Sequence, residues 1–157
     1  MPDISVVIPV KDEAANVRPL AARLRAALDP GPTWEAIFVD DGSTDATFAE
    51  LSRLAAADPR VKVVRLRRNF GQSAALQAGF DHAAGAVVVT LDGDLQNDPA
   101  DIPALVARLD DGFDVALGLR ANRQDGLLLR KLPSRAANWL IRRATGVPFR
   151  DFGCTLR

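Results

Sequence analysis

Short apolar runs alternate along this chain with segments in which apolar residues recur every three or four positions. The runs predict strands at Ile4–Val10, Trp34–Val39, Val61–Leu66, Ala86–Leu91 and Asp114–Leu117. Most of them are nearly uninterrupted, as expected for strands that helices bury on both faces. Regular alternation of strands and helices with short connections predicts an α/β fold: a Rossmann-like, doubly wound, mostly parallel sheet with helices on both faces.

The segments between the predicted strands have the periodicity of amphipathic helices. Apolar residues lie at helical spacing at Val17, Leu20, Leu24 and Leu28, at Phe48, Leu51 and Leu54, and at Ile102, Leu105, Val106 and Leu109. Beyond residue 120 the pattern changes to a loop and then a basic helix over Leu127–Thr145, bent near Pro133. The last residues, 151–157, resemble the beginning of a strand. We therefore expect a single domain over residues 1–157 that is truncated at its C-terminal end.

The charge is distributed unevenly although the formal net charge is zero. Residues 1–119 carry 18 acidic and 11 basic side chains, whereas residues 120–157 carry 9 basic and 2 acidic ones. The overall balance argues against a nucleic-acid partner, and the basic C-terminal part predicts an anionic partner there. A solvated basic helix face is the alternative.

The sequence gives no indication of export or of a membrane span. The chain starts directly with a strand pattern instead of a signal peptide, and no apolar run reaches the roughly 18 residues of a spanning helix. A single cysteine excludes an intrachain disulfide and favours a reducing compartment. We therefore expect a soluble, cytoplasmic domain.

Polar residues gather at the carboxyl ends of the predicted strands, the edge at which open parallel α/β sheets bind ligands. The clusters are residues 9–13, 40–43, 67–72, 92–96 and 118–120. Three of them contain carboxylates, which a purely structural role does not require. The pattern predicts a ligand site at this edge.

The triplet Asp92-Gly93-Asp94 carries the most chemical information. Two carboxylates at a strand end can bind a hard divalent cation such as Mg²⁺ or Mn²⁺, and Gln96 offers a third oxygen. Such a cation bridges diphosphate oxygens and offsets the charge on a leaving nucleoside diphosphate, while Gly93 lets the backbone approach the phosphates. An ordinary turn is the alternative for the triplet taken alone.

Asp40 and Asp41, which follow the second predicted strand, suit a nucleoside. A carboxylate can accept the imide hydrogen of uracil or guanine, or bind ribose hydroxyls. Helix capping by Asp41 and Ser43, with Gly42 in the turn, is the alternative, and the two roles can coexist. Glu13 likewise has two possible roles: contact with the ribose, or a favourable interaction with the dipole of the first helix.

These clusters, in this order, resemble family 2 glycosyltransferases of the GT-A fold, and among them the polyprenyl-phosphate glycosyltransferases, such as the dolichyl-phosphate mannosyltransferases and the undecaprenyl-phosphate 4-deoxy-4-formamido-L-arabinose transferases. The resemblance covers the whole chain. Its specific stretches are Val39–Asp45, Arg68–Ala75, Ala78–Asp81, Leu91–Asn97, Asn122–Asp125 and Asp151–Arg157. The chain departs from the family at Lys11, where a tyrosine that could stack on the base is usual.

The resemblance implies a role for each matched residue. It implies donor-binding residues Pro9, Glu13, Asp40, Asp41, Asp92 and Gly93; metal ligands Asp92, Asp94 and Gln96; catalytic residues Asp94, Arg120 and Asp151; and acceptor-binding residues Arg120, Arg130 and Ser134. Asp151 would orient the acceptor or stabilise an oxocarbenium-like centre. The basic segment after residue 120 would meet a polyprenyl phosphate and anionic headgroups at the membrane surface.

The resemblance thus implies a metal-dependent, inverting transfer of a sugar from a nucleotide-sugar to a polyprenyl phosphate at the cytoplasmic face of the membrane. A UDP-sugar is the favoured donor and GDP-mannose the alternative, while the sugar, the lipid and the oligomeric state stay open. Two other hypotheses are transfer to a saccharide hydroxyl, with Asp151 as general base, and a non-catalytic fragment that binds a nucleotide-sugar. A dinucleotide-binding domain is disfavoured because no Gly-x-Gly-x-x-Gly follows the first strand.

Overall fold

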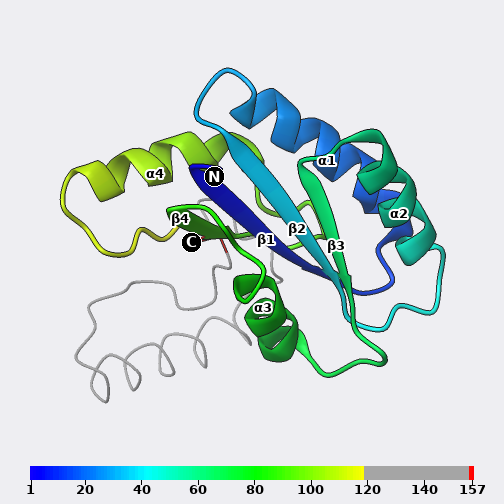
Figure 1. The fold of residues 1–157 in the computed structure, drawn as a ribbon. Coiled ribbons are helices and arrows are strands. Elements are labelled where there is room, and N and C mark those ends of the chain that lie inside the picture. The colour runs from blue at the N-terminus through cyan, green and yellow to red at the C-terminus, as the bar shows by residue number, and fades with distance from the viewer. Residues whose placement is uncertain (119–155) are drawn as a thin grey trace, which may run out of the picture.

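Strands and helices alternate along residues 1–118, which together with residues 156–157 are described by the computed structural model (Figure 1). The strands are β1 (Ile4–Val10), β2 (Trp34–Asp40), β3 (Val61–Arg65) and β4 (Val87–Thr90). The helices are α1 (Ala14–Leu28), α2 (Thr47–Ala57), α3 (Gln72–Phe80) and α4 (Ile102–Asp110), and the 3₁₀ turn η1 (Pro99–Asp101) leads into α4. The first four predicted strands are confirmed, with bounds that differ by no more than one residue.

The four strands form one parallel sheet in the order β3-β2-β1-β4. Val6 of β1 lies opposite Ala36 of β2 on one side and opposite Val89 of β4 on the other. The chain therefore winds outward from β1 to β3 and then crosses back to place β4 on the opposite side of β1. Where the winding reverses, between β1 and β4, a crevice forms beyond the carboxyl ends of the strands.

Helices cover both faces of this sheet. Helices α1, α2 and α4 lie over one face and α3 lies over the other (Figure 1). Successive residues of β1 point to the two layers, because Val6 and Ile8 belong to the larger core while Val7 packs with Ile37 and with Ala75 of α3. All seven residues of β2 are buried, as expected for a central strand covered on both faces. The predicted α/β fold is confirmed.

The fifth predicted strand, Asp114–Leu117, is wrong, because these residues adopt no regular secondary structure. The outer edge of β4 forms backbone hydrogen bonds with the last residues of the chain. Thr90 and Arg157 exchange both backbone hydrogen bonds, at 2.9 and 3.3 Å, and the N–H of Gly118 donates to the carbonyl oxygen of Leu156 at 3.0 Å. A mutual pair of this kind is antiparallel. The end of the chain therefore lies beside β4 instead of residues 114–117.

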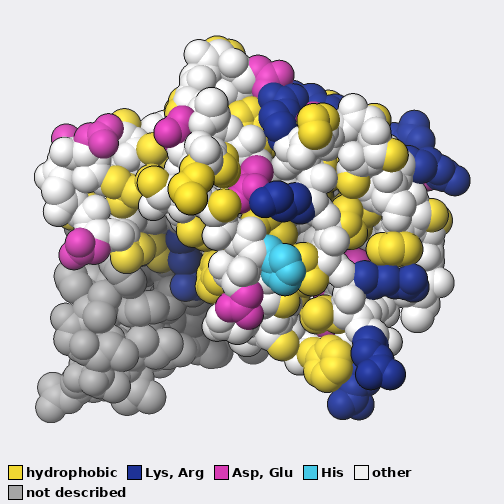
Figure 2. All heavy atoms as spheres, viewed as in Figure 1, with side chains coloured by type: hydrophobic (Ala, Val, Ile, Leu, Met, Phe, Trp, Pro, Cys, Tyr) yellow, Lys and Arg dark blue, Asp and Glu magenta, His cyan; other side chains and the backbone are white. Residues whose placement is uncertain are grey.

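Charged side chains are also unevenly placed on the folded domain. On the face shown in Figure 2, most Lys and Arg side chains lie over α1, α2 and the loop after β3, and acidic side chains gather near the end of α4. A basic loop at the edge of the sheet where the strands have their carboxyl ends favours anions electrostatically.

Within the described part of the chain, no helix is both long and apolar enough to cross a bilayer.

Candidate functional site

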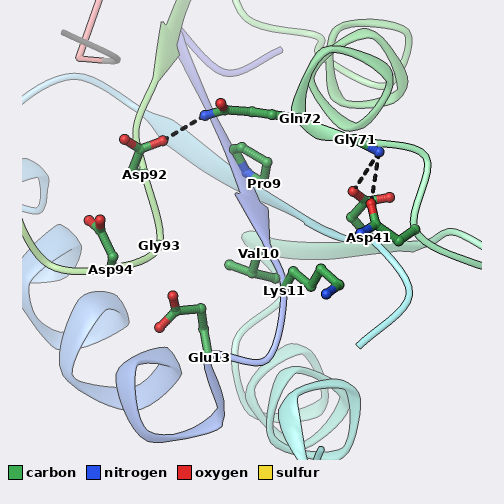
Figure 3. Close-up of a pocket in the computed structure, with 11 residues that line it drawn as sticks. Pro9, Val10, Lys11, Glu13, Asp41, Gly71, Gln72, Asp92, Gly93 and Asp94 are labelled. Carbon is green, nitrogen blue, oxygen red and sulfur yellow. Dashed lines mark hydrogen bonds between the residues drawn. The ribbon is translucent and has the colours of Figure 1, made fainter. Parts of the chain in front are cut away.

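A pocket of about 370 Å³ opens at the crevice between β1 and β4 (Figure 3). It is lined by Pro9, Val10, Lys11, Glu13, Asp41, Asn69, Gly71, Gln72, Asp92, Gly93 and Asp94. These residues come from the end of β1 and from the segments that follow β1, β2, β3 and β4. Four of the polar clusters that the sequence places at strand ends thus meet in one cavity.

The loop after β4 brings two carboxylates into this pocket. Gly93 is buried against the end of β1, and a Cβ atom at this position would lie 2.6 Å from Cγ1 of Val10, so any larger residue would push the loop away. Asp92 accepts a hydrogen bond from Nε2 of Gln72 at 2.9 Å. Asp94 accepts one from the backbone N–H of Gln96 at 3.0 Å. The acidic pair is therefore held by close packing and by hydrogen bonds.

The acidic pair suits a divalent cation that is shared with a ligand. Among the described residues, no group of three or more His, Cys, Asp or Glu side chains is placed to hold a metal by itself. Mg²⁺ in such sites is usually bound by one or two carboxylates and completed by substrate phosphates and water. Asp92 and Asp94 fit that donor set, because both line a cavity large enough for a ligand.

Asp41 joins the loop after β2 to the loop after β3. One of its carboxylate oxygens accepts the N–H of Phe70 at 2.7 Å, and the other accepts the N–H of Gly71 at 2.9 Å. The residue is only 5% exposed. Gly71 also donates to Oδ1 of Asn69, at 2.9 Å. The carboxylate thus fixes the backbone that forms one wall of the pocket.

The neighbours of Asp41 complete this junction. Gly42 has a φ of 69°, and a Cβ atom there would lie 2.4 Å from the carbonyl carbon of Arg68, so only glycine allows the two loops to touch. Asp40 is fully buried outside the pocket lining. One of its oxygens accepts the N–H of Ser43 at 2.9 Å, and the other lies 3.7 Å from Nε of Arg65.

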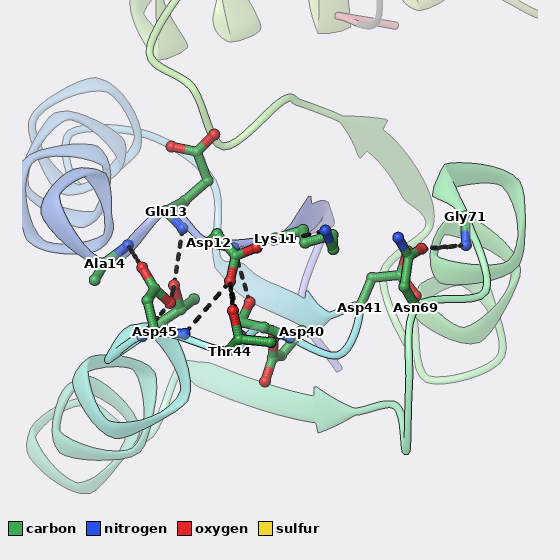
Figure 4. A network of polar contacts seen from close by, with 12 residues as sticks. Lys11, Asp12, Glu13, Ala14, Asp40, Asp41, Thr44, Asp45, Asn69 and Gly71 are labelled. Atoms are coloured by element: carbon green, nitrogen blue, oxygen red, sulfur yellow. Dashed lines mark hydrogen bonds and ion pairs between the residues drawn. The ribbon is translucent and has the colours of Figure 1, made fainter.

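A second network ties the loop after β1 to the loop after β2 (Figure 4). Asp12, at a φ of 55°, accepts hydrogen bonds from the backbone N–H and the hydroxyl of Thr44 at 2.7 and 3.1 Å. Asp45 accepts the N–H of Ala14 at 3.2 Å, and the N–H of Glu13 donates to Thr47 at 2.8 Å. The backbone hydrogen bond from Thr44 is the main reason that the pKa of Asp12 is lowered. This network sets the position of Glu13 at the rim of the pocket.

The predicted site residues fall into three groups. The pocket lining contains Pro9, Glu13, Asp41, Asp92, Gly93 and Asp94. Asp40 and Gln96 lie outside the lining. Arg120, Arg130, Ser134 and Asp151 lie outside the described residues.

Sequence reasoning gave no role to Asn69, Gly71 and Gln72, which also line the pocket. The signal that could have found them is the polar run after the third strand, which falls at the same edge of the sheet. The pairing of Asp12 with Thr44 was missed as well, and only the polar composition of the two loops pointed to it.

Comparison with known proteins gives the family. Residues 5–155 match the family described as Glycosyl transferase family 2. The chain is 49% identical over 158 residues to dodecaprenyl-phosphate galacturonate synthase of Rhizobium johnstonii, a match that covers 99% of this chain and 47% of that protein. It is 48% identical over 157 residues to undecaprenyl-phosphate 4-deoxy-4-formamido-L-arabinose transferase of Salmonella enteritidis PT4, covering 98% and 47%. The chain spans about half the length of the curated relatives it matches.

Solved structures give the fold. The mannosyltransferase PcManGT of Pyrobaculum calidifontis, in complex with GDP-Man and Mn²⁺, matches with a TM-score of 0.56 and 27% identity, over 66% of this chain and 30% of that one. Staphylococcus aureus TarS 1–349 in complex with UDP matches with a TM-score of 0.55 and 22% identity, over 69% and 32%. The expected GT-A type of α/β fold is thereby confirmed. With 151 consecutive residues matched by one family, the chain belongs to glycosyltransferase family 2.

Proposed function

We propose that this domain binds a nucleotide-sugar together with a divalent cation and transfers the sugar to a polyprenyl phosphate. The observation that carries the proposal is the shared pocket, which Asp92 and Asp94 line together with Pro9 and Asp41. A cation site beside a nucleoside site is what a nucleoside diphosphate requires. The names of the two relatives, both of which refer to polyprenyl phosphates, support the acceptor class.

The proposed reaction is a single inverting displacement at the anomeric carbon. Asp92 and Asp94 would hold Mg²⁺ or Mn²⁺, whose charge would offset the negative charge that develops on the departing nucleoside diphosphate. The bond from the anomeric carbon to the diphosphate breaks while the acceptor phosphate oxygen forms a bond from the opposite face. Because a phosphate is already ionised near neutral pH, the attack needs no strong general base.

The acceptor would be bound by residues of the basic C-terminal segment. Arg120, Arg130 and Ser134 would bind the lipid phosphate, and Asp151 would orient it. The cluster of basic residues after position 120 would attract anionic headgroups, which would bring the domain to the cytoplasmic face of the membrane.

For the donor we favour a UDP-sugar and keep GDP-mannose as the second candidate. Asp41 and Lys11 lie together on one side of the pocket, and a nucleobase that offers an imide hydrogen and a carbonyl oxygen would suit this pair. Uracil and guanine both have these groups. The structure of PcManGT with GDP-Man and Mn²⁺ keeps the second candidate open.

The test is a panel of nucleotide-sugars with Mn²⁺ and undecaprenyl phosphate, followed by measurement of the nucleoside diphosphate and the lipid-linked sugar. We expect release of nucleoside diphosphate that depends on the lipid phosphate and stops when EDTA is added. Asp94→Asn should lower the rate by at least about 100-fold, since loss of a charge-stabilising group in a transition state typically costs this much.

Other outcomes would assign the site differently. Transfer that occurs only to soluble saccharides would contradict the lipid acceptor and favour a hydroxyl acceptor. Binding of UDP in Mn²⁺ without turnover of any donor would identify a non-catalytic nucleotide-sugar-binding domain. No binding of either UDP or GDP would contradict the proposed function altogether.

A further inference from the structure

The two acidic parts of the pocket are linked through the loop that follows β3. Asp41, from the loop after β2, is bound on both oxygens by the N–H groups of Phe70 and Gly71. Helix α3 begins at the next residue, Gln72. The position of Gln72 is therefore set by Asp41 and by the rigid start of a helix.

Gln72 reaches from this loop across the crevice to the loop after β4. Its Nε2 atom donates a hydrogen bond of 2.9 Å to Oδ1 of Asp92, and both side chains line the pocket (Figure 3). The contact joins residues 20 positions apart in the sequence. An amide donor orients a carboxylate without neutralising it, whereas a lysine or arginine would compete with a cation for the same negative charge.

We propose that Gln72 is a positioning residue that orients the carboxylate of Asp92 for the cation and diphosphate of the donor. The inference rests on the proposed function. Gln72 holds one oxygen of Asp92 by a hydrogen bond and so limits the directions that the carboxylate can take in the pocket. Loss of the amide would remove one restraint on the orientation of this oxygen and would raise the entropy cost of binding the cation. Substitution of a residue that hydrogen-bonds to a metal ligand typically lowers metal affinity by about 10-fold to 100-fold.

A matched pair of substitutions tests this role. Gln72→Met removes the amide and keeps the length of the side chain. Gln77→Met is the control, because Gln77 lies on the same helix and makes a comparable bond of 2.8 Å to Asp81, away from the pocket. The affinity for UDP is measured calorimetrically in Mn²⁺ and again in EDTA.

We expect Gln72→Met to weaken UDP binding about 10-fold in Mn²⁺ and to leave the affinity in EDTA unchanged. Gln77→Met should leave both affinities unchanged. In an Asp92→Asn background, Gln72→Met should have no further effect, since the two residues act as one unit.

Three results would overturn the inference. Equal weakening in Mn²⁺ and in EDTA would mean that Gln72 binds the nucleotide directly. Unchanged affinities in both conditions, even with a lower melting temperature, would mean that the contact is only structural. Additive effects of Gln72→Met and Asp92→Asn would mean that the residues act separately. These three results count against the inference alone, because they are read with a wild-type protein that binds UDP in Mn²⁺. A wild-type protein that does not bind UDP in Mn²⁺ would contradict the proposed function, and the inference with it.

Discussion

Lys11 is the only cation among the described residues that line the pocket, where it is accompanied by four carboxylates. Its side chain extends toward Asp41 and away from Asp92 and Asp94 (Figures 3 and 4). It is 45% exposed and pairs with Asp12 at 3.4 Å. An ammonium group in this place can donate to a carbonyl oxygen of a nucleobase, where the tyrosine usual in the family would stack instead.

Replacement of Lys11 should therefore act on nucleotide affinity. We expect Lys11→Met to weaken UDP binding about 10-fold, the value of a hydrogen bond to a charged group. Lys11→Tyr should recover part of the affinity by stacking. Calorimetry with UDP measures both, with Arg23→Met as the control because Arg23 is exposed on α1. Wild-type affinity in Lys11→Met would exclude a contact between this lysine and the nucleotide.

At the scale of elements, the loops after β2 and β3 form one unit. Asp41 binds the backbone of the second loop, and Gly42 packs directly against Arg68. This junction shapes the wall of the pocket that carries Asn69, Gly71 and Gln72. A change in the junction should affect both stability and ligand binding, although Gly42 itself does not line the cavity.

Gly42→Ala tests the junction. The added methyl group would meet backbone atoms at 2.4 to 2.7 Å, at a φ of 69° that alanine disfavours. We expect a loss of about 2 kcal/mol or more in the free energy of unfolding, together with weaker UDP binding. Gly31→Ala is the control, since its nearest atom would be 3.7 Å away. Urea denaturation measures the first quantity, and equal stability of the two variants would contradict the close packing of the loops.

The strands and the edge of the sheet at which the pocket lies could be predicted from the sequence, because apolar periodicity and the position of polar residues after strands are local signals. The hydrogen bonds that join the loops to one another could not be predicted from the sequence. The bonds from Phe70 and Gly71 to Asp41 and from Gln72 to Asp92 join residues 20 to 30 positions apart, and no pattern encodes such pairs. The prediction of a fifth strand at Asp114–Leu117 was wrong for the same reason: Arg157, which is distant in the sequence, forms backbone hydrogen bonds with the edge of β4.

At the scale of the whole molecule, buried carboxylates couple the elements on which the site depends. The side chain of Asp58 is 7% exposed. It accepts hydrogen bonds from Nε of Arg60 at 3.0 Å and from Nε of Arg25 at 2.9 Å. The bond from Arg25 joins α1 to the turn before β3. Its bonds to Arg60 are the main reason that its pKa lies well below the usual range. Burial alone would raise the pKa of Glu35, but bonds from Lys62, Ser5 and Ala84 outweigh it and lower that pKa as well.

These lowered pKa values make the stability of the fold depend on pH. In the unfolded chain Asp and Glu side chains titrate near pH 4, whereas in the folded chain the pKa values of Asp58 and Glu35 are lower than this. The unfolded state therefore binds more protons in acid. The stabilisation is complete at neutral pH and is lost as the pH falls below about 5 and through the folded-state pKa values.

Asp58→Asn separates this contribution from the rest. The variant should lose about 2 kcal/mol of unfolding free energy at pH 7, because charge-assisted hydrogen bonds are removed. Between pH 5 and pH 3 its stability should decline less than that of the wild type, since one group with a lowered pKa is gone. Urea denaturation at each pH measures both effects. Asp110→Asn, at the exposed end of α4, should follow the wild-type curve. Parallel curves for Asp58→Asn and the wild type would show that Asp58 does not couple folding to protons.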